Sequence, residues 1–170
     1  MDEGTPIQFR RASRQDAASL WLVRTRAIEA IPRSCYDQPT IARWTAASMP
    51  DGFQDVITDQ HVVIAEHDAR IVGWGFFDKD TAQIEAAFVD PDFQRRGVGS
   101  QILATLEDIA REAGLASLKL LSTLNAVPFY EQAGFERRGP TKYQHRSGFE
   151  LDCVVMVKEL DGSAPSADRP

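Results

Sequence analysis

Three consecutive segments rich in β-branched and aromatic residues constrain the fold of this chain most. They span residues 61–66, 71–77 and 81–89, and only short, mostly polar turns separate them. Turns this short join neighbouring antiparallel strands, because parallel strands need a crossover of a dozen residues or more. The three segments therefore predict an antiparallel meander.

Other strand-like and helix-like patterns flank this meander, identified by hydrophobic period and by Pro and Gly at their ends. The expected elements are a strand at 7–13, a helix beginning at Ser13 or Asp16 and ending before Pro32, a helix at about 40–48, the three strands, a helix at 97–113, a strand at 117–123, a helix at 126–133, a strand near 135–138 that resumes near Tyr143, and a strand near 150–160. This order predicts a layered α/β domain, not a regularly alternating doubly wound sheet.

The charge balance limits the classes of partner. The chain has 170 residues, with 19 Lys and Arg against 25 Asp and Glu, which gives a formal net charge of −6. Nucleic-acid-binding domains concentrate positive charge, so this balance argues against a broad basic face and against nucleic acid as a partner. A small, local anion pocket is still compatible with it.

Cysteine content and the termini predict the compartment. Cys35 and Cys153 are too few for a disulfide framework and fit a reducing cytoplasm. The start of the chain lacks the pattern of a signal peptide, and the longest apolar stretch, 71–77, is far too short to span a membrane. We expect a cytoplasmic protein with one domain over 1–160, a disordered tail at 161–170, and neither a membrane partner nor a metal site.

The segment 94–100, Gln-Arg-Arg-Gly-Val-Gly-Ser, lies between an expected strand and the first turn of an expected helix. Unpaired N–H groups and the helix dipole favour an anion there, and Arg95 and Arg96 add positive charge. No Gly-Lys pair of a P-loop occurs, and a dinucleotide fingerprint would need a small residue in place of Ile102. The segment predicts a phosphate site, for CoA or another nucleotide, or a helix start whose glycines merely permit a tight turn.

The segment from Val89 to Gly99, Val-Asp-Pro-Asp-Phe-Gln-Arg-Arg-Gly-Val-Gly, resembles the acetyl-CoA motif of GCN5-related N-acetyltransferases, the GNAT family. A second segment, from Asn125 to Phe135, is similar to the family's Asn-x-x-x-x-Tyr-x-x-x-Gly-Phe motif. The resemblance covers about residues 7–160 and points to a bacterial subgroup whose substrates are mostly unassigned. It implies a mixed, largely antiparallel sheet of about six to seven strands with helices on both faces.

The resemblance also implies acetyl-CoA as cosubstrate, held at its pyrophosphate by the backbone of the 94–100 segment and along its arm by the preceding strand. The implied cofactor-binding residues are Phe88, Val89, Gln94, Arg95, Arg96, Gly97, Val98, Gly99, Ser100, Asn125 and Phe129. Asn125 has an alternative interpretation as the N-cap of the short helix that follows it.

Two residues are candidates for proton transfer. Tyr130, in the second motif, would donate a proton to the leaving CoA thiolate, because a phenol with a pKa of ~10 stays protonated at pH 7. Glu85 would accept the proton of the attacking amine, and strand alternation puts it on one face with Gln83, Ala87 and Val89. The alternatives are an aromatic packing role for Tyr130 and a solvated strand carboxylate for Glu85.

Three groups of residues could contact the acceptor. Cys35 and Tyr36 lie between the first two helices, where this family forms one wall of the acceptor cleft. The acidic run Asp78, Asp80, Glu85, Asp90 and Asp92 could attract a cationic amine, or could simply be turn charges. The basic group Arg137, Arg138, Lys142 and Arg146 could contact an anion, or could be a solvated edge.

The sequence thus predicts an acetyl-CoA-dependent N-acetyltransferase that moves an acetyl group to a primary amine by direct attack on the thioester. The acceptor is expected to be a small-molecule or protein amine, and a homodimer is expected from the family alone. The competing hypothesis is a non-catalytic acyl-CoA-binding or sensing module with the same fold.

Overall fold

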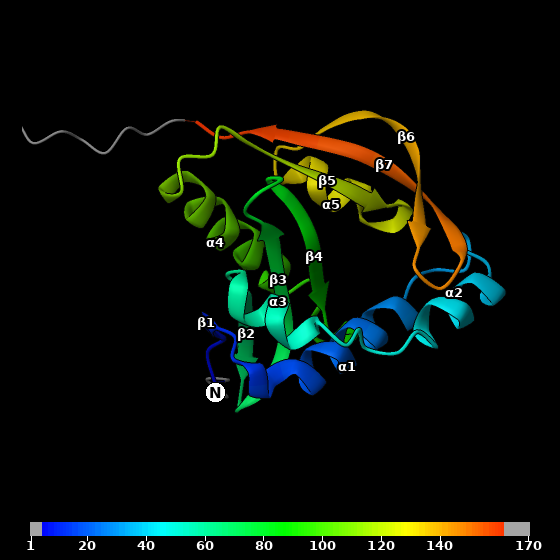
Figure 1. Ribbon diagram of the computed structural model, residues 1–170, viewed down its shortest axis with the longest axis horizontal. Coiled ribbons are helices and arrows are strands. Elements are labelled where there is room, and N and C mark those ends of the chain that lie inside the picture. Colours follow the sequence, from blue (N-terminus) through cyan, green and yellow to red (C-terminus); the bar gives the residue numbers. More distant parts are fainter. Residues whose placement is uncertain (1–4, 162–170) are drawn as a thin grey trace, which may run out of the picture.

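The computed structural model describes residues 5–161, which build one seven-stranded mixed sheet in the order β1-β2-β3-β4-β5-β7-β6 (Figure 1). The strands are β1 (Gln8–Arg11), β2 (Val63–His67), β3 (Arg70–Asp78), β4 (Gln83–Val89), β5 (Ser117–Thr123), β6 (Glu136–His145) and β7 (Phe149–Glu159). Every neighbouring pair is antiparallel except β4 and β5. The predicted fold class and the central meander, β2 to β4, are confirmed.

Helices cover both faces of the sheet and divide the core. The helices are α1 (Ala17–Glu29), α2 (Gln38–Thr45), α3 (Phe53–Asp59), α4 (Val98–Glu112) and α5 (Val127–Gln132), with single 3-10 turns η1 (Arg14–Asp16), η2 (Pro91–Phe93) and η3 (Leu124–Ala126). One core packs α4 and α5 against the sheet around Ile102 and Leu106, and a second packs α1 and α3 on the other face around Leu20 and Trp74. A third joins α2 to β7.

Three element predictions need correction. Helix α3 was not predicted, although its inward residues Phe53 and Ile57 are four positions apart and are both buried. Helix α2 begins earlier than predicted, because the Asp37 side chain accepts a hydrogen bond from the Thr40 N–H at 2.9 Å and caps it. Strand β6 is continuous, and a register shift between Arg137 and Gly139 explains why its pattern looked interrupted.

The parallel strands β4 and β5 are paired over only a short stretch of the sheet. Only Gln83 with Lys119 and Ile84 with Leu120 are in register, although each strand has seven residues. Beyond these pairs the two strands separate, which Figure 1 shows as an opening angle between β4 and β5. The later part of β4 therefore has backbone groups facing β5 that no neighbouring strand pairs.

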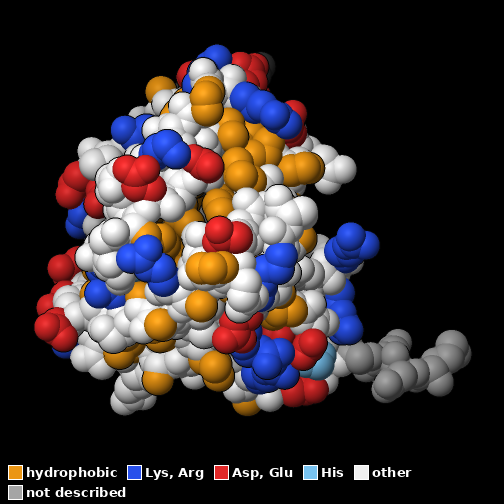
Figure 2. Space-filling model, turned by 90° about the vertical axis from the view of Figure 1, so that its right-hand side faces the viewer, with side chains coloured by type: hydrophobic (Ala, Val, Ile, Leu, Met, Phe, Trp, Pro, Cys, Tyr) orange, Lys and Arg blue, Asp and Glu red, His pale blue; other side chains and the backbone are white. Residues whose placement is uncertain are grey.

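The side of the molecule that carries α2 and the β6–β7 turn is shown in Figure 2. On this side Lys and Arg side chains are interspersed with Asp and Glu, and hydrophobic side chains gather in a band over its upper part. Much of the basic group on β6 is paired: Arg137 lies 2.5 Å from Glu131, and Lys142 lies 2.7 Å from Asp152. For these residues the solvated-edge interpretation holds.

Candidate active site

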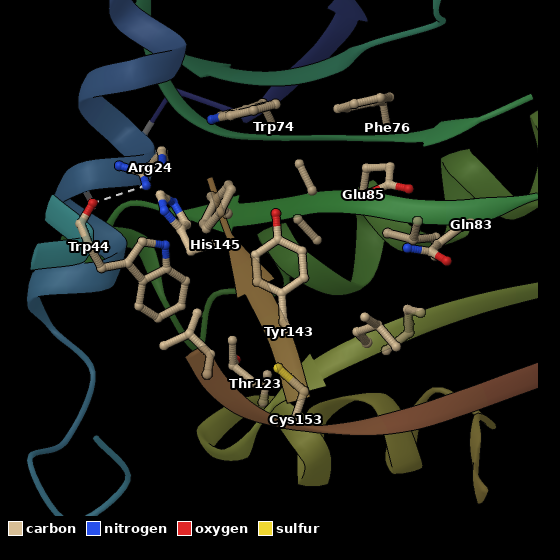
Figure 3. A pocket seen from close by; sticks show the side chains of 18 of the residues that line it. Arg24, Trp44, Trp74, Phe76, Gln83, Glu85, Thr123, Tyr143, His145 and Cys153 are labelled. Carbon is tan, nitrogen blue, oxygen red and sulfur yellow. Dashed lines mark hydrogen bonds between the residues drawn. The ribbon is translucent and has the colours of Figure 1, made fainter. Parts of the chain in front are cut away.

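A cavity of about 380 Å³ opens where β4 and β5 separate (Figure 3). Its volume lies in the range of small-molecule sites. The residues that line it are Trp21, Arg24, Trp44, Pro50, Trp74, Phe76, Gln83, Ile84, Glu85, Ala86, Ala87, Phe88, Leu120, Leu121, Thr123, Ala126, Tyr130, Tyr143, His145, Arg146, Leu151 and Cys153. Both residues predicted for proton transfer, Tyr130 and Glu85, are among them.

Glu85 enters the cavity through a β-bulge. Phe77 is in register with Ile84 and Phe76 with Ala86, so Glu85 is an extra residue on β4. Ile84 packs in the core under α4, whereas Ala86 packs in the core under α1. The predicted strict alternation along β4 is therefore wrong at this point.

The pKa of the Glu85 carboxyl group is raised in the folded protein. Partial burial raises its pKa above the usual value, and the charge of Asp78 raises it further, against smaller opposing effects of Gln83 and Lys119. A carboxylate with a raised pKa is a stronger base than an ordinary surface glutamate.

Tyr130 is held rigidly by aromatic neighbours. It is 8% exposed, and its ring lies 5.1 Å from that of Phe129 and 5.7 Å from that of Phe135, centroid to centroid. Burial raises its pKa to about 12, so the phenol is neutral at pH 7. Its hydroxyl makes no hydrogen bond to the described residues, so it can donate a proton to a molecule in the cavity.

The 94–100 segment links η2 to α4 in an unusual backbone conformation. Arg95 has φ 61° and Gly97 has φ 80°, and the first bond of the helix runs from the Gln101 N–H to the Gly97 carbonyl at 3.0 Å. The N–H groups of residues 98–100 consequently have no partner within the helix. Arg95 and Arg96 are exposed, and a side chain at 97 would meet nothing within 4 Å. Open N–H groups and two cations fit the pyrophosphate of CoA.

The buried carboxylate of Asp90 fixes the corner between β4 and this segment. It is 1% exposed, lies 2.9 Å from Arg26 Nε and 2.7 Å from Arg70 Nη2, and accepts a hydrogen bond from the Asp92 N–H at 3.0 Å. Burial alone would raise the pKa of Asp90, but the hydrogen bonds from Arg26 and Asp92 and the charges of both arginines lower it. The negative charge of Asp90 is thus balanced by Arg26 and Arg70, so Asp90 is not free to attract an amine.

The two sequence motifs meet at Gly99. A Cβ at this position would lie 3.3 Å from the Phe129 ring and 3.5 Å from Val89 Cγ2. Gly99 therefore lets the start of α4 approach α5 and the end of β4. Phe88, Val89, Phe129 and the 94–100 segment, all predicted to bind the cofactor, are in this way brought to one region around the mouth of the β4–β5 split.

Asn125 lies in η3, is exposed and does not line the cavity. The N-cap of α5 is Ala126, and no side chain caps the helix. The interpretation of Asn125 as a helix cap is therefore wrong. Its predicted contact with the cofactor stays a prediction.

The predicted acceptor contacts Cys35 and Tyr36 do not line the cavity. Tyr36 is 6% exposed; its hydroxyl donates to the Asp152 carbonyl oxygen at 2.6 Å and accepts from the Leu124 N–H at 3.0 Å. Because both bonds hold Tyr36 inside the fold, the geometry gives no support to a direct substrate contact. Cys153 is buried and also contributes to the cavity wall.

Most of the cavity wall on the side of α1 and α2 was not predicted from the sequence. Arg24, Trp44 and His145 come from three distant parts of the chain and meet there (Figure 3). The spacing of Trp44 indicates only the buried face of a helix, and nothing in the local sequence distinguishes Arg24 from a surface arginine. Among residues 5–161 no group of three potential metal ligands occurs, and no described helix is long and apolar enough to span a bilayer.

Comparison with known proteins places this geometry in a family. The family model of the acetyltransferase (GNAT) domain matches residues 32–160, and the chain belongs to this family of N-acetyltransferases. The resemblance inferred from the two motifs is confirmed.

Individual relatives agree with this assignment. The uncharacterised N-acetyltransferase YafP of Escherichia coli K12 is 28% identical over 152 residues, which are 89% of this chain and 96% of that protein. A GCN5-related N-acetyltransferase structure from Rhodopseudomonas palustris has a TM-score of 0.83 at 22% identity and covers 92% of this chain and 98% of its own. The PaiA N-acetyltransferase from Thermoplasma acidophilum, solved with coenzyme A, has a TM-score of 0.66 at 15% identity and covers 91% and 99%.

Proposed function

We propose that this acetyltransferase uses acetyl-CoA and moves the acetyl group to a primary amine bound in the cavity, with residues 1–160 acting as one catalytic domain. The observation that carries the proposal is that Tyr130 and Glu85 line one cavity at the β4–β5 split. Bound acetyl-CoA would supply an acetyl group activated as a thioester. The remaining chemistry is positioning and proton transfer, which the residues of the chain provide.

The residues around the split fit such a cosubstrate. The open N–H groups of 98–100, with Arg95 and Arg96, would hold the pyrophosphate. The free edge of β4 beside Phe88 and Val89 would bond the amides of the arm, because β5 no longer occupies that edge. Donors fixed in advance stabilise the charge that develops on a carbonyl oxygen during attack.

Glu85 would take a proton from the amine and Tyr130 would give one to the departing sulfur. An amine with a pKa of ~10.4 must lose its proton before it attacks, and this costs about 4.6 kcal/mol at pH 7. A base in the cavity lowers that barrier. Tyr130 keeps its proton at neutral pH because burial raises its pKa to about 12.

The Tyr130→Phe variant tests this function against the alternative of a sensing module. The ring still packs between Phe129 and Phe135, so the fold and the CoA affinity should be retained. For an enzyme, kcat should fall by roughly 10²-fold or more, the scale of general-acid catalysis. Calorimetry with CoA and steady-state kinetics measure the two quantities. A wild-type protein that binds CoA but acetylates no amine would instead be a sensor.

A further inference from the structure

The guanidinium of Arg24 is a buried cation at one end of the cavity. Arg24 is 5% exposed and lines the cavity from α1 (Figure 3). Its Nη2 donates to the Trp44 carbonyl oxygen at 3.1 Å, whereas its Nη1 is buried and has no hydrogen-bond partner among residues 5–161. An unpaired buried donor is costly, so a cavity wall that contains one favours a ligand that can accept a hydrogen bond.

No carboxylate of the described residues neutralises Arg24. The Trp21 ring lies 4.2 Å from its guanidinium carbon and offers a partial cation–π contact. Burial and, to a smaller extent, the charge of Arg146 together lower the pKa of Arg24 to about 10. Arg24 is nevertheless charged at pH 7, so an anion in the cavity would gain from it.

Two further donors stand beside Arg24. The Nδ1 of His145 accepts a hydrogen bond from the Ser147 N–H at 3.1 Å, so a neutral imidazole carries its proton on Nε2. Burial, Arg24 and Arg146 all lower the pKa of His145, which keeps the ring neutral at pH 7. Arg146 lines the same cavity and donates to the Ser48 carbonyl, which ties the β6–β7 turn to the segment after α2.

The rest of the cavity has a different character. Glu85 is the sole carboxylate among the described residues that line it, and Figure 3 shows it away from Arg24, next to Phe76. Aromatic rings of Trp74, Phe76 and Tyr143 form the wall between the two charged ends. The cavity thus offers a cationic end, an apolar middle and an anionic end.

We propose that the acceptor carries a carboxylate besides its amine, and that Arg24 binds this carboxylate through its free Nη1. Guanidinium and carboxylate groups form strong, directional hydrogen bonds, and His145 Nε2 can donate to the same anion. The amine then lies toward Glu85, and the apolar part of the acceptor that joins its two charged groups lies against the aromatic wall. The substrate class is an amino acid whose amine and carboxylate are separated by an apolar spacer. This inference rests on the proposed function, because it assumes that an amine reacts in this cavity.

Matched acceptors test the inference. With acetyl-CoA saturating, kcat/KM is measured for 6-aminohexanoate and 4-(aminomethyl)benzoate and for the corresponding amines without the carboxylate, pentylamine and benzylamine. The amino acids should be favoured by roughly 10- to 100-fold, the scale of hydrogen bonds to charged groups. In Arg24→Met this ratio should fall toward one. In Arg43→Met, an exposed arginine of α2 outside the cavity wall, it should be retained.

A binding measurement gives a readout apart from turnover. Calorimetry of the wild-type protein with CoA present compares 6-acetamidohexanoate with N-pentylacetamide, and the former should bind roughly tenfold more tightly. If Arg24→Met fails to fold, this comparison decides alone. The inference would be overturned if the compounds with and without a carboxylate bound equally tightly or had equal kcat/KM. It would also be overturned if phosphoethanolamine were acetylated faster than the amino acids. If amines with and without a carboxylate are acetylated equally well, the inference fails but the proposed function stands. If the protein acetylates no amine, the proposed function fails. In that case calorimetry still shows whether the Arg24 end of the cavity binds a carboxylate.

Discussion

The Tyr36 hydroxyl donates a hydrogen bond to the backbone carbonyl of Asp152 at a distance of 2.6 Å. The same oxygen accepts a bond from the Leu124 N–H, so one side chain joins the loop before α2 to β7 and to the end of β5. Burial raises the pKa of Tyr36, as expected for a phenol enclosed in the fold. Tyr36 thus stabilises the wall of the site from behind.

Replacement of Tyr36 by Phe should destabilise the protein by about 1–3 kcal/mol, because two part-buried hydrogen bonds to the backbone are lost. Urea denaturation measures this change. Tyr143→Phe is the control, since Tyr143 is 42% exposed and the free energy of unfolding should hardly change. An unchanged stability of Tyr36→Phe together with a raised KM for the acceptor would instead support the substrate contact predicted from sequence.

The Asp90→Asn variant tests the anchor of the CoA segment. At pH 7 it should lower the free energy of unfolding by about 1–3 kcal/mol, because Arg26 and Arg70 lose a buried charged acceptor. Asp92→Asn is the control: Asp92 is 65% exposed and its pair with Arg26 is worth little. The KM for acetyl-CoA should rise in Asp90→Asn alone.

The effect of Asp90 should depend on pH in one direction. The pKa of Asp90 is lowered in the folded protein, so its stabilisation is present above the usual value of 3.8 and is lost as the pH falls through the lower folded value. The difference between wild type and Asp90→Asn should therefore shrink in acid. A difference that grows as the pH falls below 4 would contradict this assignment.

Glu85 should control the acid limb of the activity profile. Because its pKa is raised above 4.5, kcat/KM should fall as the pH decreases through that raised value. Glu85→Gln should lower kcat/KM by roughly 10²-fold and remove the limb. If the fall of kcat/KM at low pH persists unchanged in Glu85→Gln, a group other than Glu85 is the general base.

The same variant should not be less stable at pH 7. A carboxyl group with a raised folded pKa contributes stability below its unfolded pKa, and this contribution is lost as the pH rises through the folded value. At neutral pH the charged Glu85 is thus slightly unfavourable, and Glu85→Gln should equal or exceed wild type in thermal unfolding. This result would separate the catalytic effect from loss of fold.

Gly97 supplies the left-handed turn before α4. Its φ of 80° is strained for any residue with a side chain, so Gly97→Ala should cost about 1–2 kcal/mol and weaken acetyl-CoA binding. Gly52→Ala is the matched control, because Gly52 has φ −85° and open space around it. Equal stability of the two variants would show that the turn tolerates a side chain.

The sequence was most informative where local chemistry determines structure. The pair Gly97 and Gly99 between a strand and an apolar helix marked the start of α4, and the structure has the left-handed residue at that point. Tyr130 could be identified because its motif matches the family. Both predictions depend on residues close together in the chain.

The parts that the sequence could not predict depend on long-range contacts. The bulge at Glu85 exists because β3 and β4 pair with one residue in excess, and no local pattern records that register. Arg24 is buried by Trp21 on its own helix and Trp44 on another, so its orphaned Nη1 follows from tertiary packing alone. The shape of the acceptor site therefore emerged only with the fold.

The central claim is amine-dependent acetyl transfer at the β4–β5 split. Its most direct test measures CoA release from acetyl-CoA with and without 6-aminohexanoate or other primary amines, together with mass spectrometry of the product. We predict CoA release that requires the amine and equals the amount of N-acetylated product, and that Tyr130→Phe reduces. Tight CoA binding without amine-dependent release for any amine, or tighter binding of ATP or NAD than of CoA, would contradict the claim.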